Sequence, residues 1–143
     1  MPDSSAIETI RFLAYAVKRQ LAIQLEAEEL GLAPMQVRVM KIIHRRSPCT
    51  ALDIASFIRR DKAQITRLIN GLLEQGLIEK VPNPKDKRSQ FLSLSPEGAK
   101  VQATLSKLTK RAEQSLSEGI AEKDMQTFFD VAKKMRKNLD ENQ

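Results

Sequence analysis

The stretch DKAQITRLINGLLEQGLIEKVPNPKDKRSQFLSL, residues 61–94, decides the fold because its apolar pattern changes period once. Up to Gly76, apolar residues recur every three to four positions, which is typical of one buried helix face. They are Ile65, Leu68, Ile69 and Leu72. Beyond Gly76, alternating patterns over 77–81 and 89–94 predict two strands around a charged, proline-broken loop. The segment therefore predicts a helix over 62–75 followed by a β-hairpin with a basic tip.

Two helices are predicted in the part of the chain before residue 47. The first, within residues 5–32, begins at a capping-box pattern of Ser5 and Glu8 and stops at Gly31. The second, over 34–46, opens with a proline, which suits the first helical position because its missing N–H is not needed there.

A short third helix is expected next, so that two helices meet at a tight turn. Thr50 and Asp53 form a cap-like pair at its start, and Arg59-Arg60 form the turn that leads into the helix over 62–75. The residues that this short helix is expected to bury are Leu52, Ala55 and Ile58.

Two more helices are predicted within 96–140, separated by a break near 117–119. Ser95-Pro96 supplies the cap and first residue of the earlier helix. The later helix is expected to bury Met125, Phe128, Phe129, Ala132, Met135 and Leu139. The predicted fold is mainly α with a small β-hairpin wing, as one domain over 1–143 whose winged helix-turn-helix lobe spans 34–95.

Composition limits the class of protein. The 143 residues are 41% apolar and 29% charged, which is ordinary for a globular domain with one core. No apolar run approaches the roughly 20 residues of a membrane helix, and residues 1–5 lack the pattern of a secretion signal. With one cysteine, Cys49, no internal disulfide is available. We therefore expect a cytoplasmic protein without a membrane partner.

Positive charge is concentrated in the middle of the chain. Between Gln36 and Gln90 there are twelve lysines and arginines against five acids, an excess of seven positive charges, while the whole chain carries +6. A basic middle segment between near-neutral ends indicates that the middle of the chain binds a polyanion. The two ends would then form a scaffold that does not contact the polyanion. On charge alone, a solvated basic surface remains an equal alternative.

The order of the predicted elements places polar residues on the helix and the wing that contact DNA in known DNA-binding proteins. Two helices at a tight turn followed by a two-stranded wing is the layout of winged helix-turn-helix proteins, whose second helix enters the major groove. We expect its outward residues to contact DNA, together with basic residues of the wing, where an arginine can enter a narrow minor groove. These candidates are Lys62, Gln64, Thr66, Arg67, Asn70, Lys85, Lys87, Arg88 and Ser89. Asp86 is expected to orient the wing, either as a partner that aims Arg88 or as a turn residue.

Three stretches resemble the multiple-antibiotic-resistance regulator (MarR) family. They are the recognition segment 61–78, the wing element Asp86-Lys87-Arg88-Ser89, and Leu94-Ser95-Pro96-Glu97-Gly98, which is similar to the family's Leu-Thr-x-x-Gly. The resemblance implies transcription regulation by a homodimer held together by helices within 5–32 and 96–140, with a wing arginine in the minor groove. It also implies a repressor that a small aromatic or anionic effector often releases from its operator. The broad apolar stripes of the terminal helices support the dimer independently.

Other functions have weaker support in the sequence. No nucleophile elbow, phosphate loop or metal-ligand spacing stands out, so we expect no enzyme, no metal and no cofactor. Tyr15, Met40 and His44 are candidates for the wall of an effector pocket, although packing explains Tyr15 and Met40 better and a helix-end position explains His44 better. Cys49 is expected to be a small buried residue rather than a redox sensor. The alternative to sequence-specific binding is an architectural protein that binds double-stranded DNA without sequence preference.

Overall fold

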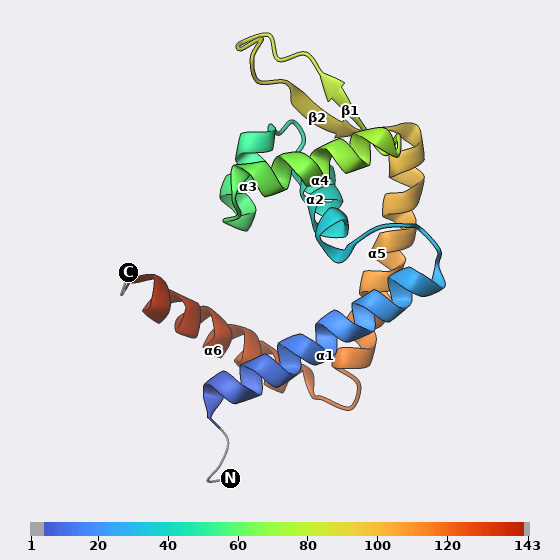
Figure 1. Cartoon of the computed structure of the whole chain (residues 1–143). Coiled ribbons are helices and arrows are strands. Elements are labelled where there is room, and N and C mark those ends of the chain that lie inside the picture. The colour runs from blue at the N-terminus through green and yellow to red at the C-terminus, as the bar shows by residue number, and fades with distance from the viewer. Residues whose placement is uncertain (1–4, 142–143) are drawn as a thin grey trace. The chain divides into compact units, whose positions relative to one another are not determined.

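The computed structural model describes residues 5–141, and the chain divides into two compact units, Met1–Thr109 and Lys110–Gln143. The described elements, labelled in Figure 1, are α1 Ala6–Ala27, α2 Pro34–Arg45, α3 Ala51–Ile58, α4 Lys62–Glu74, β1 Ile78–Val81, β2 Phe91–Leu94, α5 Pro96–Leu116 and α6 Glu122–Glu141. This is the mainly helical fold with a small hairpin that the sequence predicts. The single domain predicted over 1–143 stays a prediction.

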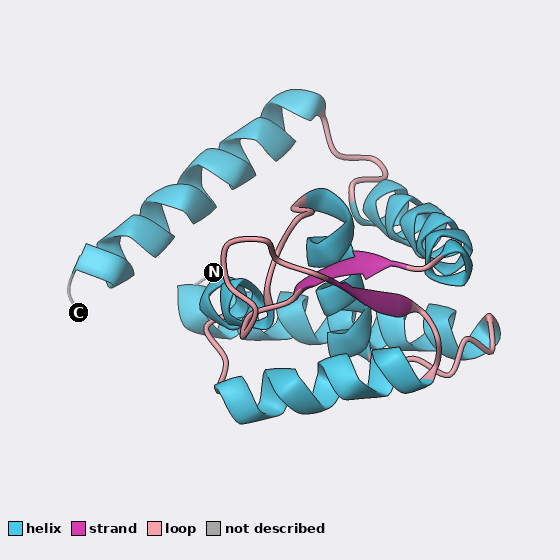
Figure 2. Cartoon of the chain, turned by 90° about the horizontal axis from the view of Figure 1, so that it is seen from above, coloured by secondary structure: helices cyan, strands magenta, loops and turns pink. Residues whose placement is uncertain are grey.

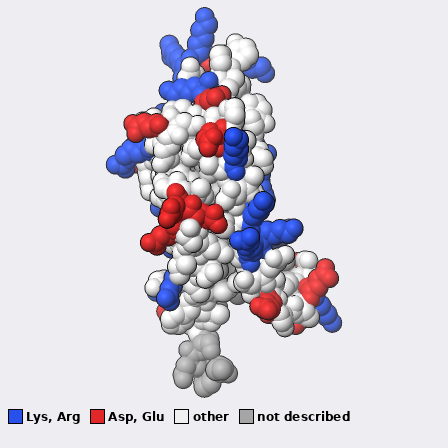
Figure 3. Space-filling model, turned by 90° about the vertical axis from the view of Figure 1, so that its right-hand side faces the viewer, with Lys and Arg blue, Asp and Glu red and all other residues white. Residues whose placement is uncertain are grey.

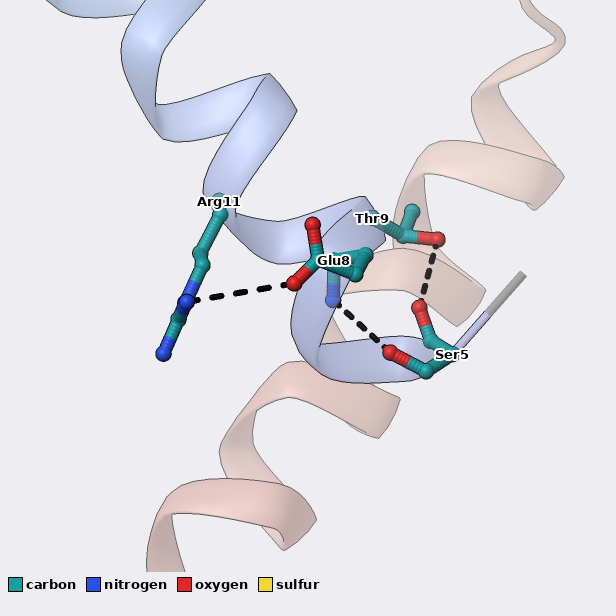
Figure 4. A network of polar contacts seen from close by, with 4 residues as sticks. All are labelled: Ser5, Glu8, Thr9 and Arg11. Atoms are coloured by element: carbon teal, nitrogen blue, oxygen red, sulfur yellow. Dashed lines mark hydrogen bonds and ion pairs between the residues drawn. The ribbon is translucent and has the colours of Figure 1, made fainter. Parts of the chain in front are cut away.

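The start of α1 is set by local hydrogen bonds (Figure 4). The Ser5 side-chain oxygen accepts a hydrogen bond of 3.0 Å from the Glu8 amide, and the Thr9 hydroxyl donates one of 3.0 Å to the Ser5 carbonyl. The Glu8 carboxylate lies 3.8 Å from the Arg11 guanidinium. The predicted cap at Ser5 is therefore confirmed, while the acid of the expected capping box turns to Arg11.

The end of α1 differs from the prediction. The helix ends at Ala27, four residues before Gly31, with Glu28 as its C-cap. Glu29 adopts a left-handed conformation with φ 52°, and Gly31 adopts another with φ 66° in the connection to α2. The predicted end of the helix is thus about one turn too late. The left-handed residue Glu29 changes the direction of the chain before Gly31 is reached.

The α2 helix begins without a hydroxyl cap. Its N-cap is Ala33, and the side-chain carbonyl of Gln36 accepts a hydrogen bond of 3.0 Å from the Ala33 amide. Pro34 needs no partner for a backbone N–H at the first helical position. Gln36 therefore supplies one half of a capping box from inside the helix.

The core of the first unit lies among α2, α3, α4 and the hairpin. Its largest fully buried side chains are Met40, Ile43, Ile54, Ile65, Leu72 and Val39. The prediction for α3 is wrong at Leu52, which is 61% exposed, whereas Ala55 and Ile58 are buried. Ile54 takes the buried place, because two apolar stripes share this short helix and only one can face α2 and α4.

The terminal helices keep large apolar side chains on their surfaces. In α6 the predicted burial is wrong for the single chain: Phe128 is 47% exposed and Leu139 is 69% exposed. Phe129 and Met135 are also exposed, while Met125 and Ala132 are half-buried. In α1, the exposed apolar and aromatic residues are Ile7, Ile10, Phe12, Leu13, Tyr15 and Ile23. Each helix is amphipathic as predicted, but nothing within its own unit covers these side chains.

No helix in the described part of the chain is both long enough and apolar enough to cross a membrane. The expectation about a secretion signal concerns residues 1–5, of which 1–4 lie outside the described residues.

Candidate nucleic-acid interface

The turn between α3 and α4 has the tight geometry expected of a helix-turn-helix. Thr50 and Asp53 close a full capping box at the start of α3: the Thr50 amide donates to the Asp53 carboxylate at 2.9 Å, and the Asp53 amide donates to the Thr50 hydroxyl at 3.2 Å. At the other end, Arg59 adopts a left-handed conformation with φ 57°, and Asp61 is the N-cap of α4. The predicted turn at Arg59-Arg60 is confirmed.

The α4 helix separates an apolar inner face from a polar outer face. Ile65, Ile69 and Leu72 are buried, and Leu68 is half-buried. Of the predicted DNA-contacting residues on this helix, Lys62, Thr66, Arg67 and Asn70 are exposed. Gln64 is half-buried, so its amide is less available than the sequence indicates. The helix ends at Glu74, and Gly76 follows with φ 72°, which confirms the predicted stop.

The wing is a two-stranded antiparallel hairpin, whose strands are drawn in magenta in Figure 2. Its register pairs Ile78 with Leu94 and Val81 with Phe91. The second strand begins at Phe91, two residues later than predicted. An isolated bridge also joins Leu92 to Cys49, with a hydrogen bond of 2.8 Å from the Leu92 amide to the Cys49 carbonyl. The base of the wing is thus held to the segment before α3.

The wing tip is shaped by hydrogen bonds of two polar side chains to the backbone. Asn83 accepts from the Lys85 amide at 3.0 Å, and the Asp86 carboxylate accepts from the Arg88 amide at 2.9 Å. Among the described residues no ion pair joins Asp86 to the Arg88 guanidinium. Of the two interpretations of Asp86, the structure therefore favours the turn residue, which sets the Arg88 backbone and leaves its side chain exposed.

One buried serine joins the recognition helix, the wing and α5. The Ser95 hydroxyl donates to the Gly76 carbonyl at 2.6 Å and accepts from the Gly98 amide at 2.9 Å, and only 5% of Ser95 is exposed. The Ser95 amide also donates to the Leu77 carbonyl at 3.0 Å. A Cβ atom added at Gly98 would lie 1.8 Å from the Leu77 carbonyl oxygen, so only glycine fits this approach. The Ser-x-x-Gly pattern therefore fixes the start of α5 against the junction between α4 and β1.

A groove of about 490 Å³ separates α4 from the wing. Four cations and no acid are found among its lining residues, which are Ala51, Leu52, Lys62, Thr66, Ile69, Asn70, Lys80, Lys87, Arg88, Ser89, Gln90 and Leu92. In Figure 3, blue side chains gather at the upper end of the molecule, where Figure 1 places the wing. Cations from two separate elements thus converge on one concave surface, as polyanion binding requires.

The groove brings together six of the predicted DNA-contacting residues: Lys62, Thr66, Asn70, Lys87, Arg88 and Ser89. It does not include Gln64, Arg67, Lys85 or the wing-orienting Asp86. Sequence reasoning missed Lys80 and Gln90, which also line it. The alternation of the strands places Lys80 and Glu79 on opposite faces of the hairpin, but it does not say which of these faces meets α4.

The three candidate effector-pocket residues differ in exposure. Met40 is fully buried in the core, His44 is exposed in the last turn of α2, and Tyr15 is 67% exposed on α1. Packing leaves none of the Met40 surface free, and its place on a pocket wall stays a prediction. The helix-end position of His44 is as expected.

Cys49 has the environment of an inert thiol. It is buried, and burial together with the nearby negative charge of Asp53 raises the pKa of the thiol above its usual value. The thiolate, which is the reactive form, is thereby disfavoured. In the described part of the chain, no three His, Cys, Asp or Glu side chains are close enough to hold a metal ion.

Comparison with known proteins agrees with this geometry. Residues 32–90 match the model of the MarR family. The multiple antibiotic resistance protein MarR of Salmonella typhimurium is 32% identical over 72 residues, and the match covers 50% of each chain, so the chain spans about half the length of this relative. The HTH-type transcriptional regulator BilQ of Clostridium symbiosum is 25% identical over 115 residues, with 80% of this chain and 77% of that protein covered.

Solved structures share the fold over nearly the whole chain. A mutant MarR from E. coli in complex with operator DNA superposes with a TM-score of 0.80 at 23% identity, covering 90% of this chain and 91% of that one. The S. aureus MepR–DNA complex gives a TM-score of 0.85 at 18% identity, covering 95% and 99%. The matched residues 32–90 contain the helix-turn-helix and the wing tip described above. Residues 32–90 are thus similar to the MarR family, and the chain shares the fold of these solved structures.

Proposed function

We propose that the chain is a sequence-specific, double-stranded DNA-binding transcriptional regulator that acts in the cytoplasm as a homodimeric repressor on a pseudo-palindromic operator. In this proposal the lobe over 34–95 reads DNA and the helices within 5–32 and 96–140 hold the dimer, as parts of one domain. The proposed contacts are those predicted from the sequence, with α4 in the major groove and Arg88 in the minor groove.

One observation carries the proposal. The outer face of α4 and the wing tip line the same groove, and that groove has four cations and no acid. A protein surface of this charge attracts the phosphates of a duplex, and polar residues such as Asn70 can read base edges beside them. The lining residues of the groove include no histidine, cysteine or carboxylate that could activate a nucleophile or hold a metal.

Sequence specificity is tested by selection of bound duplexes from a random pool. The proposal expects an enriched pseudo-palindrome with half-sites about one turn, roughly 34 Å, apart, and an affinity for it at least about 10³-fold above that for random duplex. An architectural protein would bind both duplexes equally well. That result would refute specific regulation while leaving DNA binding in place.

The homodimer is supported by the apolar residues that α1 and α6 each expose. Phe12 is 72% exposed on α1 and Phe129 is 52% exposed on α6. Each lies among other exposed apolar residues of the same helix. Exposed apolar surface of this kind marks an interface. A two-fold axis would present two recognition helices to one operator. Light scattering that finds a stable 16.2 kDa particle at micromolar concentration would contradict the dimer.

Release by a small aromatic or anionic effector rests on the resemblance to the family alone. Its test is a shift of operator affinity on addition of small aromatic acids, measured by fluorescence anisotropy of labelled operator. Unchanged affinity across such a panel would leave a repressor that only competes with polymerase.

A further inference from the structure

We propose that the groove between α4 and the wing seats one sugar–phosphate strand of the duplex, and that Lys80 contacts the phosphates of this strand. The inference rests on the proposed function and adds to it a path for one DNA strand. It also adds a residue outside the recognition helix and the wing tip.

The path follows from the shape of a duplex. Each backbone strand is the wall that separates a major groove from the adjacent minor groove. If α4 lies in one and the wing tip in the next, the strand between them must pass between α4 and the wing. The structure has a groove of about 490 Å³ at that place, lined by Lys62 and Thr66 from α4 and by Lys80 and Arg88 from the hairpin.

The chemistry of the groove fits a phosphodiester strand. Lys62 stands in the first turn of α4 and Lys80 stands on β1, so each wall carries a cation. Ser89 and Gln90 add neutral hydrogen-bonding groups, and no carboxylate lines the groove. Leu52, an exposed apolar side chain in the same lining, suits the apolar face of a deoxyribose. Protein contacts to DNA are mostly of this backbone type.

Thr66 has a smaller part in this contact than the sequence indicates. Its hydroxyl donates a hydrogen bond of 2.9 Å to the Lys62 carbonyl, so its proton is already used within α4. Lys80, by contrast, is exposed and has no ion-pair partner among the described residues. Lys80 pairs across the hairpin with the buried Leu92, well below the wing tip. It is therefore placed to contact the sugar–phosphate strand of the DNA rather than the floor of the minor groove.

The test replaces Lys80 with glutamine and measures operator affinity against salt concentration. In the proposed homodimer the substitution removes two phosphate contacts, one from each subunit, and is expected to reduce the slope of log K against log salt by about 1.8. Between roughly 50 and 200 mM salt, wild type should then lose about 12-fold more affinity than Lys80→Gln. The loss should be the same for operator and for random duplex, because a phosphate contact carries no sequence information.

Lys100→Gln is the matched control, because Lys100 is exposed on α5 and does not line the groove. It should keep the wild-type slope. A second arm uses operators in which single phosphates are replaced by neutral methylphosphonates. The replacement that weakens wild type most should lie between the major-groove and minor-groove contacts, and should not weaken Lys80→Gln further.

The outcomes separate the two proposals. If Lys80→Gln keeps the wild-type slope while Arg88→Ala loses operator affinity, the strand path is wrong and DNA binding stands. If wild type shows no salt-dependent binding to any duplex, the proposed function itself fails. Equal unfolding midpoints of wild type and Lys80→Gln in urea would exclude loss of folding as the cause.

Discussion

Gly98→Ala tests how closely α5 is locked to the base of the wing. The new Cβ atom would lie 1.8 Å from the Leu77 carbonyl oxygen and 2.8 Å from the Leu77 carbonyl carbon. Contacts below 3.0 Å are essentially never found for real Cβ atoms, so the two backbones must separate by more than 1 Å. The Leu77 carbonyl cannot simply turn away, because it accepts the 3.0 Å hydrogen bond from the Ser95 amide.

The expected cost combines three effects. Overpacking of this kind costs about 1–3 kcal/mol. Weakening the hydrogen bond between Ser95 and Leu77 adds about 0.5–1.5 kcal/mol. The better helix propensity of alanine offsets about 1 kcal/mol. The net loss of unfolding free energy is therefore about 2 kcal/mol, which corresponds to a fall in Tm of roughly 4–8 °C for a chain of this size.

The assay is urea and thermal unfolding followed by circular dichroism at one fixed protein concentration, since a dimer would make Tm depend on concentration. Gly71→Ala is the control, because its Cβ would meet the flexible end of Gln36 at 2.9 Å rather than backbone. Its gain in helix propensity and its disturbance of the Gln36 cap should nearly cancel. A Gly98→Ala protein as stable as wild type, or a Gly71→Ala protein that loses as much, would refute the reasoning.

Three further predictions concern Arg88, Ser95 and Cys49. Arg88→Ala should weaken operator binding more than tenfold, by about 1–3 kcal/mol, in anisotropy titrations at physiological salt, and unchanged binding would remove the arginine from the interface. Ser95→Ala should weaken operator binding in wild type but much less in Arg88→Ala, because Ser95 acts by positioning the wing. Ser95→Thr, which keeps the hydroxyl, should restore binding, and additive losses would argue against positioning. Burial raises the pKa of the Cys49 thiol, so unfolding free energy should fall as pH rises past the ordinary thiol value of about 8.5, and Cys49→Ala should flatten that fall.

The sequence by itself determined the elements whose causes are local. The cap of Thr50 with Asp53, the proline after Ser95 and the change of period after Gly76 each act within a few residues, and the helices and strands begin close to the predicted positions. The wing tip followed for the same reason, because Asp86 sets its turn through a neighbouring amide. The helix-turn-helix and its wing were therefore predictable without tertiary information.

Only the tertiary structure decided which side chains meet across elements. Leu52 and Ile54 are both apolar, and their burial depends on which stripe of α3 faces its neighbours. Lys80 became part of the groove only when β1 was placed beside α4. Gly98 is required by a carbonyl twenty-one residues earlier in the chain, at Leu77. The periodicity of a segment shows that one of its faces is apolar, but it does not show which surface covers that face. A face is buried only by packing against another surface, and that surface is often distant in sequence.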